Sequence, residues 1–154
     1  MEIIKPHNKI SRPVESWEQI KLEVEELKKF ILACKFRGKH KSCYAIHHAQ
    51  VSWTPYNFFV VSLNHVLGER ALFDRTVIIN PVLISGEQEQ EVFEGCMSFP
   101  FKRHPKKVKR FNDIIVDYYD EWGEAHRDHC MGIKAQIFQH EIDHGLGKNI
   151  YFKE

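Results

Sequence analysis

The segment Gln139-His140-Glu141-Ile142-Asp143-His144 constrains this chain more than any other part of it. It contains the pattern H-E-x-x-H, with two histidines four positions apart. On an α-helix, residues at this spacing lie on one face about one turn apart, so His140 and His144 can bind the same metal ion. Glu141 lies one step around the helix and can move a proton. The segment therefore predicts a metal-binding helix, from about Lys134 to Gly145.

Such a site needs a third protein ligand, because catalytic zinc sites commonly use three and leave one position for water or substrate. The ten residues after His144 include one carboxylate side chain, Glu154, and no histidine. We therefore expect the third ligand upstream. Cys96 is the best candidate, since a cysteine thiolate is a good metal ligand.

Two segments together resemble the motifs of the peptide deformylases. Glu94-Gly95-Cys96-Met97-Ser98 is similar to that family's E-G-C-L-S, with Met97 in place of leucine. The helical segment is similar to the family's Q-H-E-x-D-H and matches every fixed position. The separation of 44 residues between Cys96 and His140 suits a family that places strands and a loop between the two.

A third segment, residues 43–50, is similar to the family's first motif, G-x-G-x-A-A-x-Q, but departs from it. Gln50 is retained, whereas His47 and His48 replace the two alanines, and Cys43 and Ala45 replace the two glycines. Neighbours on an extended segment point in opposite directions, so at most one of the two histidines should face the site. We expect both to affect packing or pocket shape rather than to bind metal.

The resemblance implies a metal-dependent hydrolase that removes the N-formyl group from the formyl-methionine end of new polypeptides and releases formate. The expected cofactor is one divalent ion, Fe²⁺ natively, although Zn²⁺, Ni²⁺ or Co²⁺ could occupy the same ligands. Glu141 would transfer the proton, and the Gln50 amide and the Met97 backbone N–H would stabilise charge on the formyl oxygen. The implied metal ligands are Cys96, His140 and His144.

Weaker matches suggest further roles. Tyr44, Ala45 and Ile46 fall at positions where the family contacts bound peptide, and Arg103 falls near the substrate pocket. Glu94 either orients a ligand histidine or pairs with a cation such as Arg103, and both alternatives stay open.

Composition is consistent with one catalytic domain over residues 1–154. Lysine plus arginine total 22 and aspartate plus glutamate 21, so the overall charge does not argue for a nucleic-acid or acidic-membrane partner. One basic cluster is expected to be a solvated surface, with contact to substrate or ribosome as the alternative. Its members are Lys102, Arg103, Lys106, Lys107, Lys109 and Arg110.

The expected setting is the cytoplasm. No apolar run approaches the ~20 residues of a membrane helix, and the first residues lack the apolar core of a signal peptide. The four cysteines are too sparse for a disulfide scaffold. The expected partners are N-formylmethionyl nascent peptides, with transient ribosome contact as a further candidate, and the expected state is a monomer.

Hydrophobic periodicity predicts an α+β fold, in which antiparallel β-sheets surround the central metal-binding helix and an N-terminal helix precedes them. That first helix should span Trp17 to Phe36, after a capping pair of Ser16 and Gln19. Turns are expected at Ser85-Gly86, Asn112-Asp113 and Trp122-Gly123. Strands are expected at 58–64, 76–80, 89–93, 114–119 and 124–129. The resemblance further implies a short form like those of bacteriophages, without the C-terminal helix of longer members.

Two other functions compete with deformylation. The first is a catalytically impaired or repurposed metal-binding relative whose altered first motif no longer admits substrate. The second is another metallohydrolase, such as a peptidase that uses the same helix. Gln50 and Glu141 are both present, and neither a binding module nor an ordinary peptidase needs this pair together with Cys96.

Overall fold

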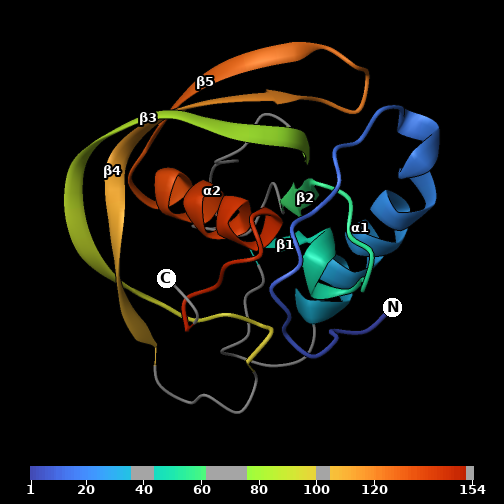
Figure 1. Ribbon diagram of the computed structural model, residues 1–154, viewed down its shortest axis with the longest axis horizontal. Coiled ribbons are helices and arrows are strands. Elements are labelled where there is room, and N and C mark those ends of the chain that lie inside the picture. Colours follow the sequence, from blue (N-terminus) through green and yellow to red (C-terminus); the bar gives the residue numbers. More distant parts are fainter. Residues whose placement is uncertain (36–43, 62–75, 100–104, 152–154) are drawn as a thin grey trace.

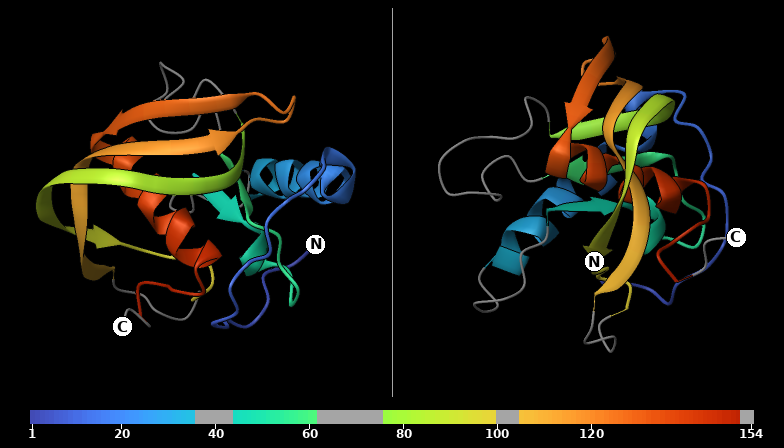
Figure 2. Two further views of the ribbon diagram at one scale, coloured as in Figure 1. Left: turned by 45° about the horizontal axis from the view of Figure 1, so that its top comes forward. Right: turned by 90° about the vertical axis from the view of Figure 1, so that its left-hand side faces the viewer.

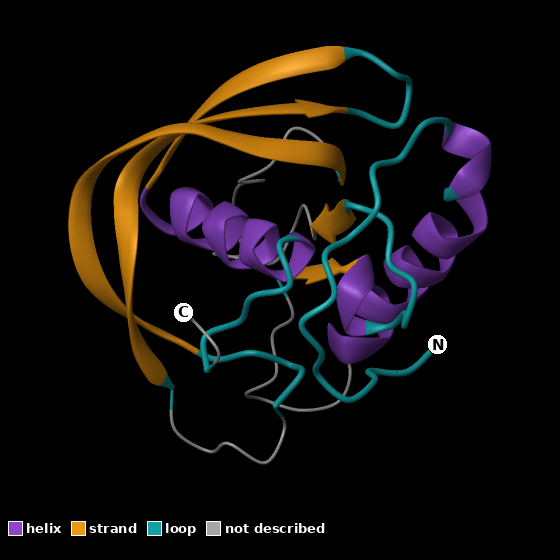
Figure 3. Ribbon diagram, in the orientation of Figure 1, coloured by secondary structure: helices purple, strands orange, loops and turns teal. Residues whose placement is uncertain are grey.

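The computed structural model describes residues 1–35, 44–61, 76–99 and 105–151. Its five described strands form one antiparallel sheet in the order β1-β2-β3-β4-β5. The fold is α+β, as predicted, with helices and strands shown in Figure 3. The elements are a 3₁₀ turn η1 (Trp17–Gln19), α1 (Lys21–Lys35), β1 (Ala45–His47), a 3₁₀ turn η2 (His48–Gln50), β2 (Phe58–Val61), β3 (Val77–Glu94), β4 (Lys106–Tyr119), β5 (Ala125–Met131) and α2 (Gly132–Gly145).

The long strands β3 and β4 curve around α2, so that this helix lies on the concave side of the sheet (Figure 1). The further views in Figure 2 show the same wrapping, with α1 on the other side of β1 and β2. The predicted central helix is therefore confirmed, although one curved sheet, rather than several, surrounds it among the described residues.

The sheet separates two apolar cores. Phe59 and Ile78 face α2 and pack with Phe138, whereas Phe58 and Val60 face the other way and pack against α1. Successive residues of a strand point to opposite faces, so a strand covered on both sides is apolar throughout. This explains why all four residues of β2 are buried.

The N-terminal helix is confirmed over the described residues, with a 3₁₀ turn before its regular part, and its predicted end at Phe36 lies outside them. The Gln19 side chain accepts hydrogen bonds from the backbone N–H groups of Glu15 and Ser16, at 2.8 and 3.2 Å. The apolar face of the helix is buried against the sheet at Ile20, Val24, Leu27 and Ile31. No helix among the described residues is both long and apolar enough to cross a membrane.

Two predicted turns are wrong. Ser85-Gly86 lies inside β3 and Asn112-Asp113 inside β4, so the predicted strands 76–80 and 89–93 belong to a single strand. Gly86 serves a different purpose: a Cβ there would lie 2.3 Å from Cδ2 of Phe111, so glycine allows that ring to cross the strand. The turn at Trp122-Gly123 is confirmed, with Gly123 at φ +81° between β4 and β5.

Candidate active site

The structure brings together the three side chains predicted to bind metal. Nε2 of His140 and Nε2 of His144 lie 3.3 Å apart, and Sγ of Cys96 lies 3.4 Å from Nε2 of His144. All three donor atoms are within 4.8 Å of one another. The helix supplies the two histidines one turn apart, and the segment that follows β3 supplies the cysteine.

This geometry fits a metal ion. A tetrahedral ion with bonds of about 2.0–2.3 Å to nitrogen and sulfur holds neighbouring ligand atoms about 3.3–3.6 Å apart. Burial lowers the pKa of His144 well below its ordinary value, which keeps it in the neutral form that binds metal. Burial also acts against charge on His140, but hydrogen bonds with Cys96 and Glu94 outweigh it and raise its pKa.

Glu94 orients His140. Its Oε2 lies 2.8 Å from Nδ1 of His140, which leaves Nε2 of that ring directed at His144 and Cys96. Burial acts to raise the pKa of Glu94, but hydrogen bonds from Arg110 and His140 outweigh it and lower the pKa to about 2. Glu94 therefore stays ionised in the interior. It both orients a histidine and pairs with a cation, which combines the two predicted alternatives, but the cation is not Arg103.

That cation, Arg110, is a component of the site that the sequence interpretation missed. Its Nε and Nη2 donate to the two oxygens of Glu94 at 2.7 and 2.8 Å, and its Nη1 donates to Oδ2 of Asp143 at 2.6 Å. Arg110 is only 3% exposed, so its assignment to a solvated basic surface is wrong. A signal was available, since Arg110 shares its strand face with buried Val108 and Ile114.

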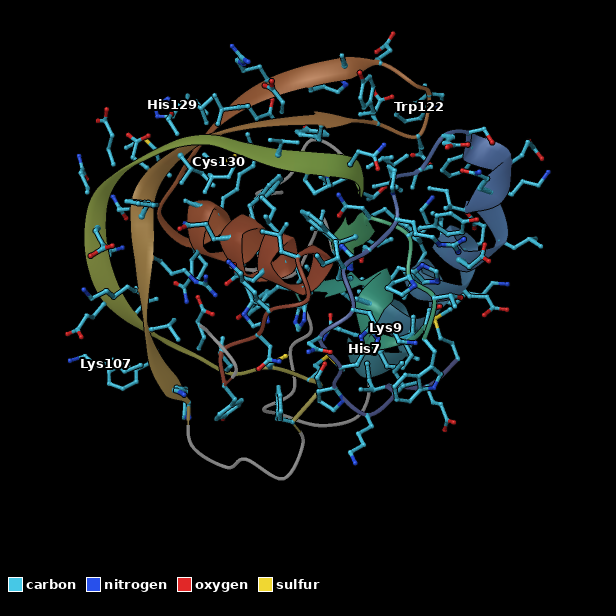
Figure 4. The ribbon with its side chains drawn as sticks, in the orientation of Figure 1. His7, Lys9, Lys107, Trp122, His129 and Cys130 are labelled. Atoms are coloured by element: carbon cyan, nitrogen blue, oxygen red, sulfur yellow. The ribbon has the colours of Figure 1, made fainter. Side chains whose placement is uncertain are left out.

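The rest of the basic cluster is described in part. Lys106, Lys107 and Lys109 are exposed, and Lys107 lies on the outside of the curved sheet (Figure 4). Lys107 pairs with a glutamate of the neighbouring strand, as does Lys109. Lys102 and Arg103 lie outside the described residues, so the predicted contact between Arg103 and substrate stays a prediction.

Glu141 is placed to exchange a proton. Its side chain lines the cavity next to the metal-ligand group, and among the described residues its buried Oε2 has no hydrogen-bond partner. Burial raises the pKa of Glu141 to about 7. A carboxylate with this pKa and a free oxygen can both accept and return a proton near neutral pH.

Gln50 approaches the same group from η2. Its Nε2 lies 3.1 Å from Oγ of Ser98 and 3.8 Å from Sγ of Cys96, while its Oε1 accepts the backbone N–H of His47 at 2.9 Å. The donor end of the amide is thus turned toward the segment that carries Cys96. Met97, whose backbone N–H is the second predicted donor, also lines the cavity.

A cavity of about 220 Å³ opens beside these groups. Its lining also includes the apolar side chains of Phe93, Ile133 and Ile137, together with Gln136. Tyr44 and Ala45, two of the predicted substrate contacts, line it as well. The third, Ile46, is fully buried in the core beneath α1 and is not among the lining residues.

A second group of side chains has the chemistry of metal ligands, but its hydrogen bonds stabilise a turn. Asp120, Glu124 and His126 lie together at the turn between β4 and β5. Asp120 accepts the backbone N–H groups of Trp122 and Glu124, and its other oxygen lies 2.7 Å from Nε2 of His126. These contacts account for the cluster as the framework of a tight turn.

Comparison with known proteins decides the family. The sequence model described as Polypeptide deformylase matches residues 3–153. The chain belongs to this family. A peptide deformylase of Wolinella succinogenes is 32% identical over 127 residues, which cover 82% of this chain and 73% of that protein. A peptide deformylase of Karelsulcia muelleri is 35% identical over 91 residues, 58% of this chain and less than half, 46%, of that protein.

The fold is that of the deformylases as well. The crystal structure of a peptide deformylase from Legionella pneumophila superimposes with a TM-score of 0.80, covering 99% of this chain and 85% of that one at 23% identity. A structure from Thermus thermophilus gives a TM-score of 0.77 at 27% identity, covering 98% and 84%. The relatives and solved structures named here are all peptide deformylases.

Within this deformylase fold, the two histidines that depart from the family's first motif are both buried, and neither lines the cavity. Nδ1 of His48 accepts the backbone N–H of Tyr56 at 3.0 Å, and its ring stacks on Tyr56 and tilts against Phe58. His47 lies on the opposite side, toward α2. Both histidines therefore contribute to packing, as predicted.

Proposed function

We propose that this protein is a peptide deformylase that hydrolyses the formamide bond of N-formylmethionyl peptides, releasing formate and a free amino terminus. The observation that carries the proposal is the convergence of Cys96, His140 and His144 beside Glu141, at a cavity that apolar side chains also line. The family match supports the same activity.

The residues that would hold the ion are Cys96, His140 and His144, and a thiolate with two imidazoles suits several first-row divalent ions, Fe²⁺ and Zn²⁺ among them. When bound, the ion would lower the pKa of a water molecule and polarise the formyl carbonyl.

Residues of the protein carry out proton transfer and stabilise the charge that develops during the reaction. Glu141 takes a proton from the attacking water at its unpartnered oxygen and later gives it to the departing amine. As the water oxygen bonds to the formyl carbon, charge grows on the formyl oxygen, and Nε2 of Gln50 and the backbone N–H of Met97 donate hydrogen bonds to it. The C–N bond then breaks. Phe93, Ile133 and Ile137 offer an apolar surface to the methionine side chain.

Nascent chains that begin with formyl-methionine are the natural source of such substrates. We further propose that the protein acts in the cytoplasm as a monomer and that it contacts the ribosome transiently.

The test is formate release from formyl-Met-Ala-Ser by protein purified anaerobically and loaded with Fe²⁺. We expect turnover by the wild type, none from acetyl-Met-Ala-Ser, and a loss of roughly 10²-fold or more in Glu141→Gln at equal metal content. The matched control is Glu91→Gln, an exposed carboxylate of β3, which should keep the wild-type rate. A folded, fully metallated wild type without turnover would contradict the proposal and favour the impaired relative.

A further inference from the structure

His47 occupies the space between η2, which carries Gln50, and the end of α2, which carries His144. It is fully buried, yet it neither lines the cavity nor belongs to the metal-ligand group. Its backbone N–H also contacts the carboxylate of Glu141. The imidazole itself lies outside the cavity lining and the metal-ligand group, so any influence of the ring on the reaction must pass through other residues. Its contacts reach both the turn that carries Gln50 and the helix end that carries His144.

On the side of η2, His47 makes two hydrogen bonds. Its backbone N–H donates to Oε1 of Gln50 at 2.9 Å, and its Nδ1 accepts the backbone N–H of Ala49 at 3.0 Å. The second bond caps the 3₁₀ turn, whose unpaired N–H groups would otherwise lack partners. Because Oε1 of Gln50 is held by His47, its Nε2 points toward Cys96 and Ser98.

On the side of α2, the His47 ring approaches the helix backbone. Its Nε2 lies 3.3 Å from Oδ1 of Asn57, and a Cβ on Gly145 would lie 3.0 Å from this Nε2 and 2.6 Å from that Oδ1. Gly145 directly follows His144, so the imidazole fills the gap between the turn that carries Gln50 and the helix that carries two metal ligands. Since Nδ1 accepts a hydrogen bond, the ring proton lies on Nε2 and is donated to Asn57.

We propose that His47 is a positioning residue for Gln50: by capping η2 and resting on Gly145, its imidazole sets where the Gln50 amide meets the reacting formyl group. The inference rests on the proposed deformylase function. His48 provides a natural comparison, because it is an adjacent buried histidine with one similar hydrogen bond, directed at Tyr56 rather than at Gln50 or α2.

The kinetic test compares three variants with the wild type at a temperature at which thermal melts show all of them folded. His47→Ala should lower kcat roughly 10- to 100-fold with little change in KM, because a donor displaced by about 1 Å stabilises the transition state poorly. His47→Asn should recover most of the loss, since asparagine can cap the turn in the same way. His48→Asn should lower the melting temperature without changing kcat.

A double-mutant cycle with Gln50 separates positioning from general loss of structure. If His47 acts through Gln50, then His47→Ala should cause almost no further loss of kcat when Gln50 is already alanine. An equal fractional loss in both backgrounds, or an unchanged kcat in His47→Ala, would overturn the proposal.

A measurement that needs no turnover covers the case in which the wild type fails to release formate. In Zn²⁺-loaded, ¹⁵N-labelled protein, the Gln50 side-chain amide resonances are identified by their loss in Gln50→Ala. We expect them to shift in His47→Ala and to stay in place in His48→Asn. Unmoved resonances would overturn the positioning role, whereas shifted resonances in a protein without turnover would contradict the deformylase function alone.

Discussion

Nδ1 of His140 and Oε2 of Glu94 lie 2.8 Å apart and connect α2 to the end of β3. Because Arg110 holds both oxygens of Glu94, the carboxylate cannot turn freely, and the His140 ring keeps its other nitrogen directed at Cys96 and His144. The properties of the metal site should therefore depend on a residue that does not bind the ion.

Glu94→Gln should weaken Zn²⁺ binding about 10- to 100-fold, because the amide holds the ring less firmly and makes the ligand less basic. Competition with a chromophoric chelator measures the change. Glu91→Gln, an exposed position on the same strand, is the control and should bind as the wild type does. Equal affinities in all three proteins would mean that Glu94 does not orient the ligand.

Arg110→Met should lower the free energy of unfolding by about 3–5 kcal/mol, since it removes the cation paired with the buried carboxylate of Glu94 and with the partly buried carboxylate of Asp143. Arg110→Lys should lie between this variant and the wild type, because lysine keeps the charge but cannot make the paired contacts. Urea unfolding gives the values. The matched control is Arg127→Met, which removes a bidentate contact to Asp117 on the exposed face and should change the free energy of unfolding far less than Arg110→Met does.

Gly86→Ala should destabilise the protein by about 1–3 kcal/mol, because the new methyl group would overlap the Phe111 ring. Phe111→Leu in the same chain should relieve part of this loss. Gly95→Ala, where a Cβ meets nothing within 4 Å, should change stability far less. If the two alanine variants melt at the same temperature, the close approach of Phe111 is not what requires glycine.

The pH dependence of stability should show the burial of His48. Burial, with the charge of Arg12 as a smaller contribution, lowers its pKa from 6.5 to about 4. Below pH 6.5 the unfolded chain takes up a proton that the folded protein excludes, so the free energy of unfolding falls as pH decreases from about 6.5 to about 4. Above pH 6.5 the residue contributes no pH dependence. The slope from this one group is at most about 1.4 kcal/mol per pH unit.

His48→Asn removes this titration but keeps an acceptor for the Tyr56 N–H. The difference in unfolding free energy between wild type and variant should therefore shrink or change sign as pH falls through this window, with the variant gaining in relative terms. Urea unfolding at several pH values gives the comparison. Parallel curves would show that His48 is not held neutral by the fold.

The sequence by itself determined the helices and indicated the three candidate metal ligands. The four-residue spacing of His140 and His144 and the apolar spacing of α1 follow from helix geometry, which is local and can be read along the chain. Cys96 was also accessible as a candidate ligand, because its neighbours carry a recognisable motif. For Gln50, the motif gave the residue but not the direction of its amide.

Only the tertiary structure decided which charges and glycines face the interior. Arg110 looked like one more basic residue until β4 was seen to pair with β3 and cross α2, which places its guanidinium between Glu94 and Asp143. Gly86 was interpreted as part of a turn because the ring that requires a glycine there belongs to Phe111, 25 positions further along the chain. His47 and His48 became distinguishable only through what packs against each. Burial and charge pairing depend on which distant segments meet, and a pattern of neighbouring residues does not contain that information.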